Sequence, residues 1–339
     1  MNRKMIVYTV GRMVLLEAGI LLLPLLVSIL YRETCAWAFV LTVLLAAIVG
    51  LPITLFCKPK NSLIYAKEGF VIVAMTWLAF SAIGALPFVF SGEIPSFADA
   101  FFETVSGLTT TGASILRDVE SMSHGLLFWR SFTHWIGGMG VLVFIMAIVP
   151  DVSGRPMHIL RAEMPGPVVG KLVPRIKDTA KILYLIYIAM TVLEIVLLLC
   201  GGMSLFDSLL HAFGTAGTGG FGIKADGLAG YNAYLQWVIA IFMLLFGVNF
   251  NLYYLLLIKR FRAALHSSEL ATYLIIVLVA SGVITFNIYP LYHNVGEAVR
   301  QSVFQVASIT TTTGYSTADF NLWPGLSKAI LFMLMFVGG

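Results

Sequence analysis

The chain has 339 residues, of which 59% are hydrophobic and only 11% are charged, and its mean hydropathy is +0.93. An ordinary soluble domain is about 25% charged, so this composition excludes that class and predicts an all-α polytopic membrane protein. The net charge of only +4, with no run of basic and interleaved aromatic residues, argues against nucleic acid as a partner.

Two apolar segments at the start of the chain are long enough to cross a membrane. They cover about residues 6–30 and 36–57, and a polar stretch with Lys58 and Lys67 follows. About 20 apolar residues span a bilayer, so both segments are predicted transmembrane helices. Residues 1–68 therefore form two helices that stand outside the pattern described next.

An arrangement of four parts begins at residue 69. A span is predicted over about 69–90, a short helix over 97–108 and a longer helix over 125–150. The short helix is too short to cross a membrane and runs into loop 1, Ser106–Ser114, which reads Ser-Gly-Leu-Thr-Thr-Thr-Gly-Ala-Ser. This order of span, half-helix, Thr/Gly loop and span defines repeat 1, residues 69–178.

Two further copies of this arrangement follow. Repeat 2, residues 179–269, has predicted helices at about 180–201, 206–214 and 233–258. Repeat 3, residues 270–339, has predicted helices at about 270–290, 296–307 and from about 323. Their Thr/Gly loops are loop 2, Gly214–Phe221, and loop 3, Ser308–Ser316.

The last apolar stretch is shorter than its counterparts. From Leu326 it offers only about 14 apolar residues, and no charged anchor follows. Because about 20 such residues are needed to cross a bilayer, we expect that the chain is truncated within a membrane span.

The three Thr/Gly loops predict an ion pathway. Non-helical backbone at membrane depth is tolerated only where it is buried in protein or lines a water-filled cavity. Backbone carbonyls in such loops can replace the water around a monovalent cation, and the C-terminal end of each half-helix carries partial negative charge. Glycine permits backbone angles that other residues disfavour, and threonine hydroxyls can hold an extended loop in place. The alternative is a set of outer turns that only cap helices.

The distribution of basic residues predicts the orientation. With the N-terminus in the cytoplasm, 15 of the 21 Lys and Arg residues lie on the cytoplasmic side and six on the outer side. All three loops then re-enter from outside. We expect four acidic residues near the outer mouth of the pathway to be solvated charges of loops and half-helices. They are Asp99, Glu103, Asp207 and Asp319.

Two other classes of protein fit part of the pattern. A secondary carrier, such as a cation:proton symporter, commonly has interrupted helices and intramembrane carboxylates, and Glu17 and Glu194 lie in otherwise apolar helices. Parallel repeats with all loops on one side favour the pore. A membrane enzyme would need clustered His, Asp or Glu residues or an HExxH, GxSxG or P-loop motif, and the sequence contains none of these. We expect neither enzyme activity nor an organic cofactor.

Four motifs resemble those of the ion-translocating membrane subunit of bacterial Trk potassium uptake systems, within the Trk/Ktr/HKT superfamily. They are loop 1, Trp135–Gly140, Arg161–Pro167 and Thr312–Thr317, and the resemblance covers essentially the whole chain. The two leading helices favour the Trk branch over the shorter Ktr branch.

The resemblance implies a pseudo-fourfold pore of four span–half-helix–loop–span units, of which three are present here. The fourth unit, and the glycine-rich gate that follows Gly338, would be absent, so we expect no ion flux from these 339 residues alone. The transported ion would be potassium, and the filter residues that the resemblance implies are Thr110, Thr111, Gly112, Gly217, Thr218, Gly219, Thr312, Thr313 and Gly314. In the family, glycine at the key filter position goes with potassium selectivity, whereas serine in the first repeat marks some sodium-conducting plant members. All three positions are glycine here, which favours potassium. A sodium-permeable member stays the alternative.

The resemblance also implies a location and partners. The subunit would be a multi-pass protein of the bacterial cytoplasmic (inner) membrane and would form a homodimer. A cytosolic nucleotide-binding regulatory subunit would bind on the cytoplasmic side, where the basic segments 151–181 and 259–262 lie. Basic residues there could also bind membrane lipid headgroups.

Overall fold

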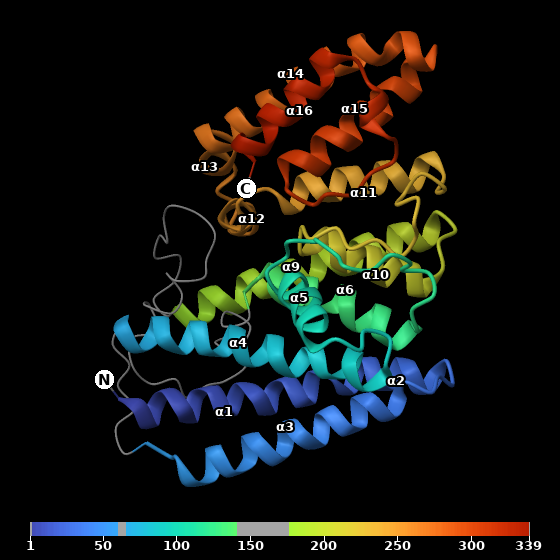
Figure 1. Ribbon diagram of the computed structural model, residues 1–339. Helices are drawn as coiled ribbons and strands as arrows, with labels where there is room; N and C mark the ends of the chain where they lie inside the picture. Colours follow the sequence, from blue (N-terminus) through green and yellow to red (C-terminus); the bar gives the residue numbers. More distant parts are fainter. Residues whose placement is uncertain (1, 60–65, 141–175, 339) are drawn as a thin grey trace. The chain divides into compact units, whose positions relative to one another are not determined.

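Every element in the described part of the chain is helical (Figure 1). The computed structural model describes residues 2–59, 66–140 and 176–338. Within these ranges five helical segments are long and apolar enough to cross a membrane, and a bent pair of helices makes a sixth. The prediction of an all-α polytopic membrane protein is therefore confirmed. The part of the predicted helix 125–150 beyond residue 140 and the motif Arg161–Pro167 lie outside the described residues.

The chain forms two compact units, Met1–Tyr184 and Leu185–Gly339. The boundary between them falls inside helix α9, Ile176–Cys200. The first unit contains loop 1, and the second contains loops 2 and 3.

The first span is interrupted near its middle. It consists of α1, Arg3–Ile20, and α2, Leu22–Leu30, with a turn at Leu21, whereas the sequence predicted one continuous helix. Pro24 accounts for the interruption, because its ring has no N–H to donate to the Ile20 carbonyl and crowds that group.

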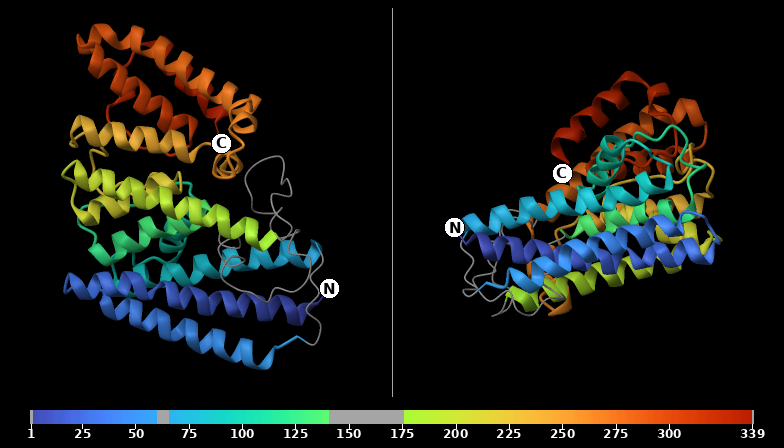
Figure 2. Two further views of the ribbon diagram at one scale, coloured as in Figure 1. Left: turned by 180° about the vertical axis from the view of Figure 1, so that it is seen from behind. Right: turned by 60° about the horizontal axis from the view of Figure 1, so that its bottom comes forward.

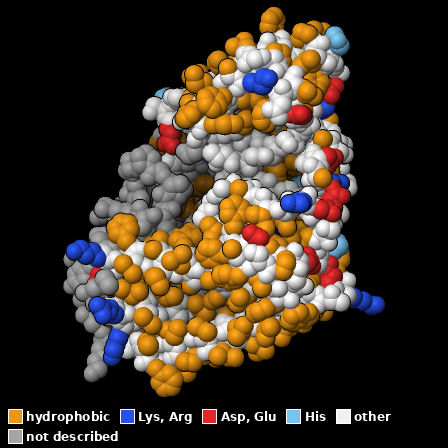
Figure 3. Space-filling model, viewed as in Figure 1, with side chains coloured by type: hydrophobic (Ala, Val, Ile, Leu, Met, Phe, Trp, Pro, Cys, Tyr) orange, Lys and Arg blue, Asp and Glu red, His pale blue; other side chains and the backbone are white. Residues whose placement is uncertain are grey.

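The second span, α3 (Ala36–Phe56), packs against α1 and exposes a wide apolar surface. Figure 2 shows α1 and α3 side by side in both views. Leu44, Ile48 and Leu55 on α3 are 54%, 65% and 71% exposed. A helix with this much exposed apolar surface requires an apolar surrounding, which a lipid bilayer would provide. On the face drawn in Figure 3, hydrophobic side chains cover most of the described surface and charged groups are sparse.

The connection between the two leading spans is tied to repeat 1 by Glu33. Its carboxylate accepts hydrogen bonds from the backbone N–H groups of His124 at 2.6 Å and Gly125 at 3.0 Å. These groups begin α6, His124–Gly138, and have no partner within that helix. Burial alone would raise the pKa of Glu33, but the hydrogen bonds from Gly125 and His124 outweigh it and lower the pKa below its ordinary value.

The described helices after α3 include three sets that follow the order of a long helix, a short helix, a loop and a further helix. In repeat 1 these are α4 (Ala66–Ser91), α5 (Phe97–Leu108) and α6. In repeat 2 they are α9, α10 (Leu205–Ala216) and α11 (Ala233–Phe246), and in repeat 3 they are α14 (Ser268–Tyr292), α15 (Val295–Thr310) and α16 (Gly325–Val337).

The three half-helices begin with the same cap. A Ser or Asn side chain accepts a hydrogen bond from the N–H of an acidic residue three positions later, in the pairs Ser96–Asp99, Ser204–Asp207 and Asn294–Glu297. Such a cap satisfies one of the free N–H groups of the first turn, and an acidic residue there is favoured by the helix dipole. Half-helix α15 has 16 residues and α5 and α10 have 12 each, so the third is longer by about one turn.

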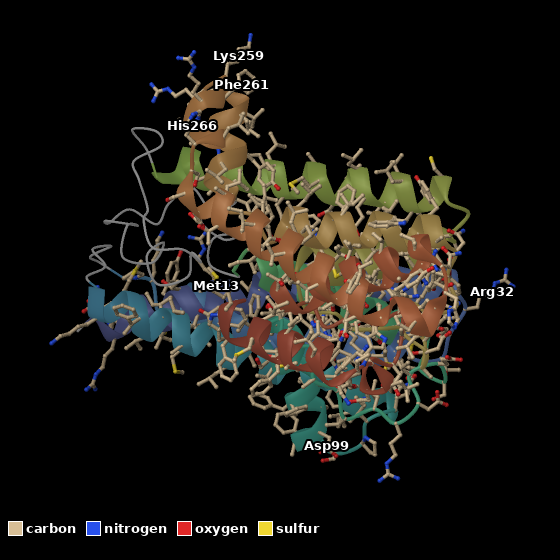
Figure 4. The ribbon with its side chains drawn as sticks, turned by 90° about the horizontal axis from the view of Figure 1, so that it is seen from above. Met13, Arg32, Asp99, Lys259, Phe261 and His266 are labelled. Atoms are coloured by element: carbon tan, nitrogen blue, oxygen red, sulfur yellow. The ribbon has the colours of Figure 1, made fainter. Side chains whose placement is uncertain are left out.

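The single helix predicted over 233–258 is wrong. Helix α11 ends at Phe246, and α12, Phe250–Leu257, leaves it at an angle of 89°. Gly247 caps the end of α11, and Asn249 begins α12 by accepting a hydrogen bond from the N–H of Asn251 at 3.1 Å. A glycine cap followed by an Asn cap is a stop signal and a start signal in sequence. The short helix α13, Phe261–Leu265, follows; Figure 4 shows Lys259, Phe261 and His266 grouped at this end of the second unit.

Candidate ion-binding site

The three Thr/Gly loops repeat one backbone turn. One residue beyond each helix cap, a threonine adopts the left-handed conformation, and a glycine two residues later has a positive φ as well. The threonines are Thr110, Thr218 and Thr312, with φ of 54°, 51° and 58°. The glycines are Gly112, Gly220 and Gly314, with φ of 73°, 69° and 85°. A β-branched residue in this conformation costs about 1 kcal/mol or more, so its threefold recurrence indicates a constrained functional turn.

This turn fixes which residues of loop 2 correspond to those of the other loops. Gly217 caps α10 in the place that Thr109 holds on α5. The structural equivalents of residues 110–112 are therefore residues 218–220, one position later than the triplet 217–219 that the sequence suggested. The sequence suggested 217–219 because the Thr-Gly dipeptide of loop 2 ends at Gly219. The glycine with a positive φ is the next residue, Gly220.

Hydroxyl pairs hold the turns of loops 1 and 3. The side-chain oxygens of Thr109 and Thr111 lie 2.9 Å apart, and those of Thr311 and Thr313 lie 2.8 Å apart. Thr109 and Thr311 also donate to the backbone carbonyl four residues earlier in their half-helices. The corresponding residues of loop 2 are Gly217 and Gly219, which have no hydroxyl groups.

Loop 2 is instead supported by loop 3. A side chain at Gly220 would collide with the carbonyl oxygen of Thr313, so the two backbones are in direct contact. The hydroxyl of Tyr315, which is buried, donates to the carbonyl oxygens of His211 at 3.4 Å and Phe221 at 3.5 Å. The two loops therefore form one packed structure within the second unit.

The helix after each loop approaches the loop through a glycine. A side chain at Gly137 of α6 would collide with the carbonyl of Leu108, the last residue of half-helix α5. In repeat 3, Gly338 packs in the same way on the carbonyl of Thr310, the last residue of α15. In repeat 2, Gly247 packs against loop 3 instead.

Helix α6 ends at Gly138, and Gly140 has a φ of 74°. The glycines of the motif Trp135–Gly140 thus provide both a close approach and a helix end. Helices α6 and α11 have 15 and 14 residues, and both end at or beside a glycine.

The four acidic residues that were expected to be solvated at the outer mouth differ in their exposure and contacts. Asp99 and Asp319 are exposed, as expected. Asp207 accepts a hydrogen bond from the Tyr231 hydroxyl at 3.2 Å. The expectation for Glu103 is wrong, because this residue is only 1% exposed and forms an ion pair within the first unit. Half-helix α5 buries that face against α6, which the sequence spacing alone did not reveal.

The two carboxylates that would favour a carrier are buried against neighbouring helices. Glu17 of α1 is buried beside Gly84 of α4, and Glu194 of α9 is buried beside Thr215, which lies in α10 at the start of loop 2. Among the described residues, no group of three or more His, Cys, Asp and Glu side chains could hold a metal ion. The oxygens that the turns themselves offer to a cation are those of backbone carbonyls and threonine hydroxyls.

These features define a class of protein. It is a polytopic helical membrane protein in which half-helices of 12 to 16 residues, too short to cross a bilayer, end in strained Thr/Gly turns. Known proteins identify the family more closely. The family model for TrkH, a cation transport protein, matches residues 37–339.

Individual relatives agree with that match. The chain is 37% identical to the Trk system potassium uptake protein TrkH of Salmonella typhimurium, over 100% of this chain and 71% of the relative. It is 31% identical to TrkG of Escherichia coli, over 99% of this chain and 70% of the relative. The crystal structure of the potassium transporter TrkH from Vibrio parahaemolyticus superposes with a TM-score of 0.84 at 29% identity, covering 100% of this chain and 71% of that one. The chain belongs to the TrkH family of cation transport proteins.

Proposed function

We propose that this chain carries potassium into the cell through a pathway lined by the three Thr/Gly turns. The observation that carries this proposal is the recurrence of one strained backbone turn at the C-terminal end of three half-helices. The partial negative charge at each of these helix ends favours a cation. Carbonyl oxygens of the turns would take the place of water around the dehydrated ion.

The recurring backbone turn supports a revised set of residues for this proposed filter. We assign it to the equivalent triplets 110–112, 218–220 and 312–314, so that Gly220 replaces Gly217 of the sequence-based set. The hydroxyl pairs of loops 1 and 3 would hold their carbonyls in place, and loop 3 would support loop 2. Glycine at positions 112, 220 and 314 favours potassium over sodium, as the family resemblance implies.

Growth of a potassium-uptake-deficient bacterium on low potassium tests this function. Expression from the complete gene should restore growth, and a matched variant that replaces Gly314 by valine should not. Failure to restore growth, with the parent protein present in the membrane, would contradict the proposal. Equal uptake of sodium and potassium would instead identify a sodium-permeable member. Potassium uptake coupled to proton entry at a fixed ratio of protons to potassium ions would identify a symporter.

We also propose that the protein lies in the bacterial inner membrane with its N-terminus in the cytoplasm. Two natural cysteines, Cys57 and Cys200, would then lie on opposite sides of the membrane, Cys200 being exposed. A membrane-impermeant maleimide added to intact cells should label a variant that keeps only Cys200. A variant that keeps only Cys57 should be labelled only after the cells are opened, and the reverse pattern would invert the proposed topology.

The proposed partners are a second copy of the chain, a cytosolic nucleotide-binding regulatory subunit and membrane lipids. Support for a cytoplasmic contact comes from three exposed basic residues: Lys259 and Arg260 on the connection between α12 and α13, and Arg262 on α13. Replacing these three residues by glutamine should weaken co-purification of the regulatory subunit. Unchanged co-purification would remove this segment from the contact.

A further inference from the structure

Glu103 connects half-helix α5 to the limb of chain that leaves the first Thr/Gly turn. One carboxylate oxygen accepts from the Ser114 hydroxyl at 2.9 Å, and the other accepts from the backbone N–H of Ile115 at 3.0 Å. Nε of Arg130 on α6 donates to the same carboxylate at 2.6 Å. One buried side chain thus joins a half-helix, an outgoing loop limb and the following helix.

The burial of these groups gives the contact its importance. Glu103 and Arg130 are 1% and 4% exposed, whereas Ser114 and Ile115 are exposed. A buried carboxylate paired with a guanidinium holds its geometry because both groups lose water and must satisfy each other. Ser114 and Ile115, which follow the glycine of the proposed filter by two and three residues, are therefore attached to a buried support although they are themselves exposed.

The other two repeats have different residues at the same place. Glu103, His211 and Gln305 each lie nine positions before the glycine of their turn, and all three are buried. His211 lies 3.3 Å from the Tyr231 hydroxyl, and the side-chain oxygen of Gln305 has no hydrogen-bond partner within the described residues. Helix α11, the counterpart of α6, contains no Lys or Arg. The ion-paired support is thus a feature of repeat 1.

We propose that Glu103, held by Arg130, is a positioning residue that fixes the outgoing limb of loop 1 and so contributes to discrimination between potassium and sodium. This inference rests on the proposed function of the three turns. Sodium and potassium differ in size, so a carbonyl ring whose backbone is held at the larger ion's spacing can discriminate between them. Releasing residues 114–115 from their support would let the turn adapt to the smaller ion.

The test is the ratio of potassium to sodium uptake in cells that express the complete gene. Glu103→Gln keeps the size and one acceptor oxygen but removes the charge that pairs with Arg130. The ratio should fall by about tenfold, the size expected when hydrogen bonds to a charged group are weakened. Ser114→Ala removes the hydroxyl that donates to Glu103 and that accepts from the Leu116 N–H, both at an exposed position, so the variant should fold and lower the ratio by a smaller factor.

A role in folding alone gives a different result. It would lower potassium and sodium uptake by the same factor, because fewer molecules would be active, and it would leave their ratio unchanged. Glu17→Gln, which removes another buried carboxylate of the same unit, is the matched control and should not change the ratio. In a Glu103→Gln background, Ser114→Ala should lower the ratio by a smaller factor than it does in the parent, because both changes weaken the same support.

The outcomes separate this inference from the proposed function. If Gly112→Ser lowers the ratio and neither Glu103→Gln nor Ser114→Ala does, the positioning role is overturned and the filter assignment stands. If the Glu103→Gln protein does not reach the membrane, the ratio of potassium to sodium uptake measured for Ser114→Ala decides alone. If the parent protein does not take up potassium, the proposed function itself fails.

Discussion

Gly220 and the carbonyl group of Thr313 lie so close that a side chain at residue 220 would overlap the carbonyl oxygen. The two residues belong to different loops, 93 positions apart, and their contact joins the second and third turns into one structure. By contrast, no atom lies within 4 Å of the Cβ position at Gly314, although its φ is 85°.

This contrast predicts different outcomes for two alanine variants. Gly220→Ala should abolish potassium uptake and lower the amount of folded protein, because the backbone of loop 3 cannot move away without losing its own contacts. Gly314→Ala should fold, at a cost of about 1–2 kcal/mol for its left-handed backbone. Fluorescence-detected size-exclusion chromatography and uptake measurements check both; equal behaviour of the two variants would contradict the contact.

Gly112→Ser should reduce discrimination against sodium. Gly112 has a φ of 73°, and a side chain there strains the turn and displaces the backbone of the proposed filter. The ratio of potassium to sodium uptake is the measurement. An unchanged ratio, with normal expression, would remove Gly112 from the filter.

Tyr315→Phe should loosen the attachment between loops 2 and 3 while preserving the packed ring. The lost hydroxyl donates to His211 and Phe221, and such bonds contribute about 1 kcal/mol net to the free energy of unfolding. Chemical denaturation in detergent should detect the loss. Tyr292→Phe, whose hydroxyl accepts from Trp323 at 3.3 Å outside the loops, is a matched control for stability and should leave the ion ratio unchanged.

Stability in acid should depend on Glu33. Its pKa is lower in the folded protein than in the unfolded chain, so the unfolded chain takes up the proton first as the pH falls. The contribution of this carboxylate is therefore complete at neutral pH and is lost as the pH falls through the lowered pKa. Thermal unfolding in detergent between neutral and acidic pH should show this loss. Glu33→Gln should be less stable at neutral pH and should lack this part of the pH dependence; an identical pH profile would contradict it.

Much of the fold was predictable because the spans, half-helices and Thr/Gly loops are separated by composition. Half-helix α5 coincides with the predicted range 97–108. The sequence analysis did not predict the interruption of the first span at Pro24 or the bend between α11 and α12 at Gly247. In both places a long apolar run outweighed a single helix-breaking residue. Both breaks have a local signal, a proline in one case and a Gly-Val-Asn stop and start in the other.

The candidate site was harder to predict because its contacts join residues that are far apart in sequence. Arg130 is the only charged residue among the apolar positions of α6, and this isolation is a signal that it has a buried partner. Nothing in the sequence identifies that partner as Glu103. The correspondence of Glu103, His211 and Gln305 is equally hidden, since a carboxylate, an imidazole and an amide share no pattern.

The direct contact between loops 2 and 3 has a consequence for how this protein can change. A larger side chain in one of these loops fits only if the other loop moves or becomes smaller at the contact. Neither loop can therefore be changed alone. In a directed-evolution experiment that selects for altered ion preference, changes at position 220 should arise together with changes at 313–315.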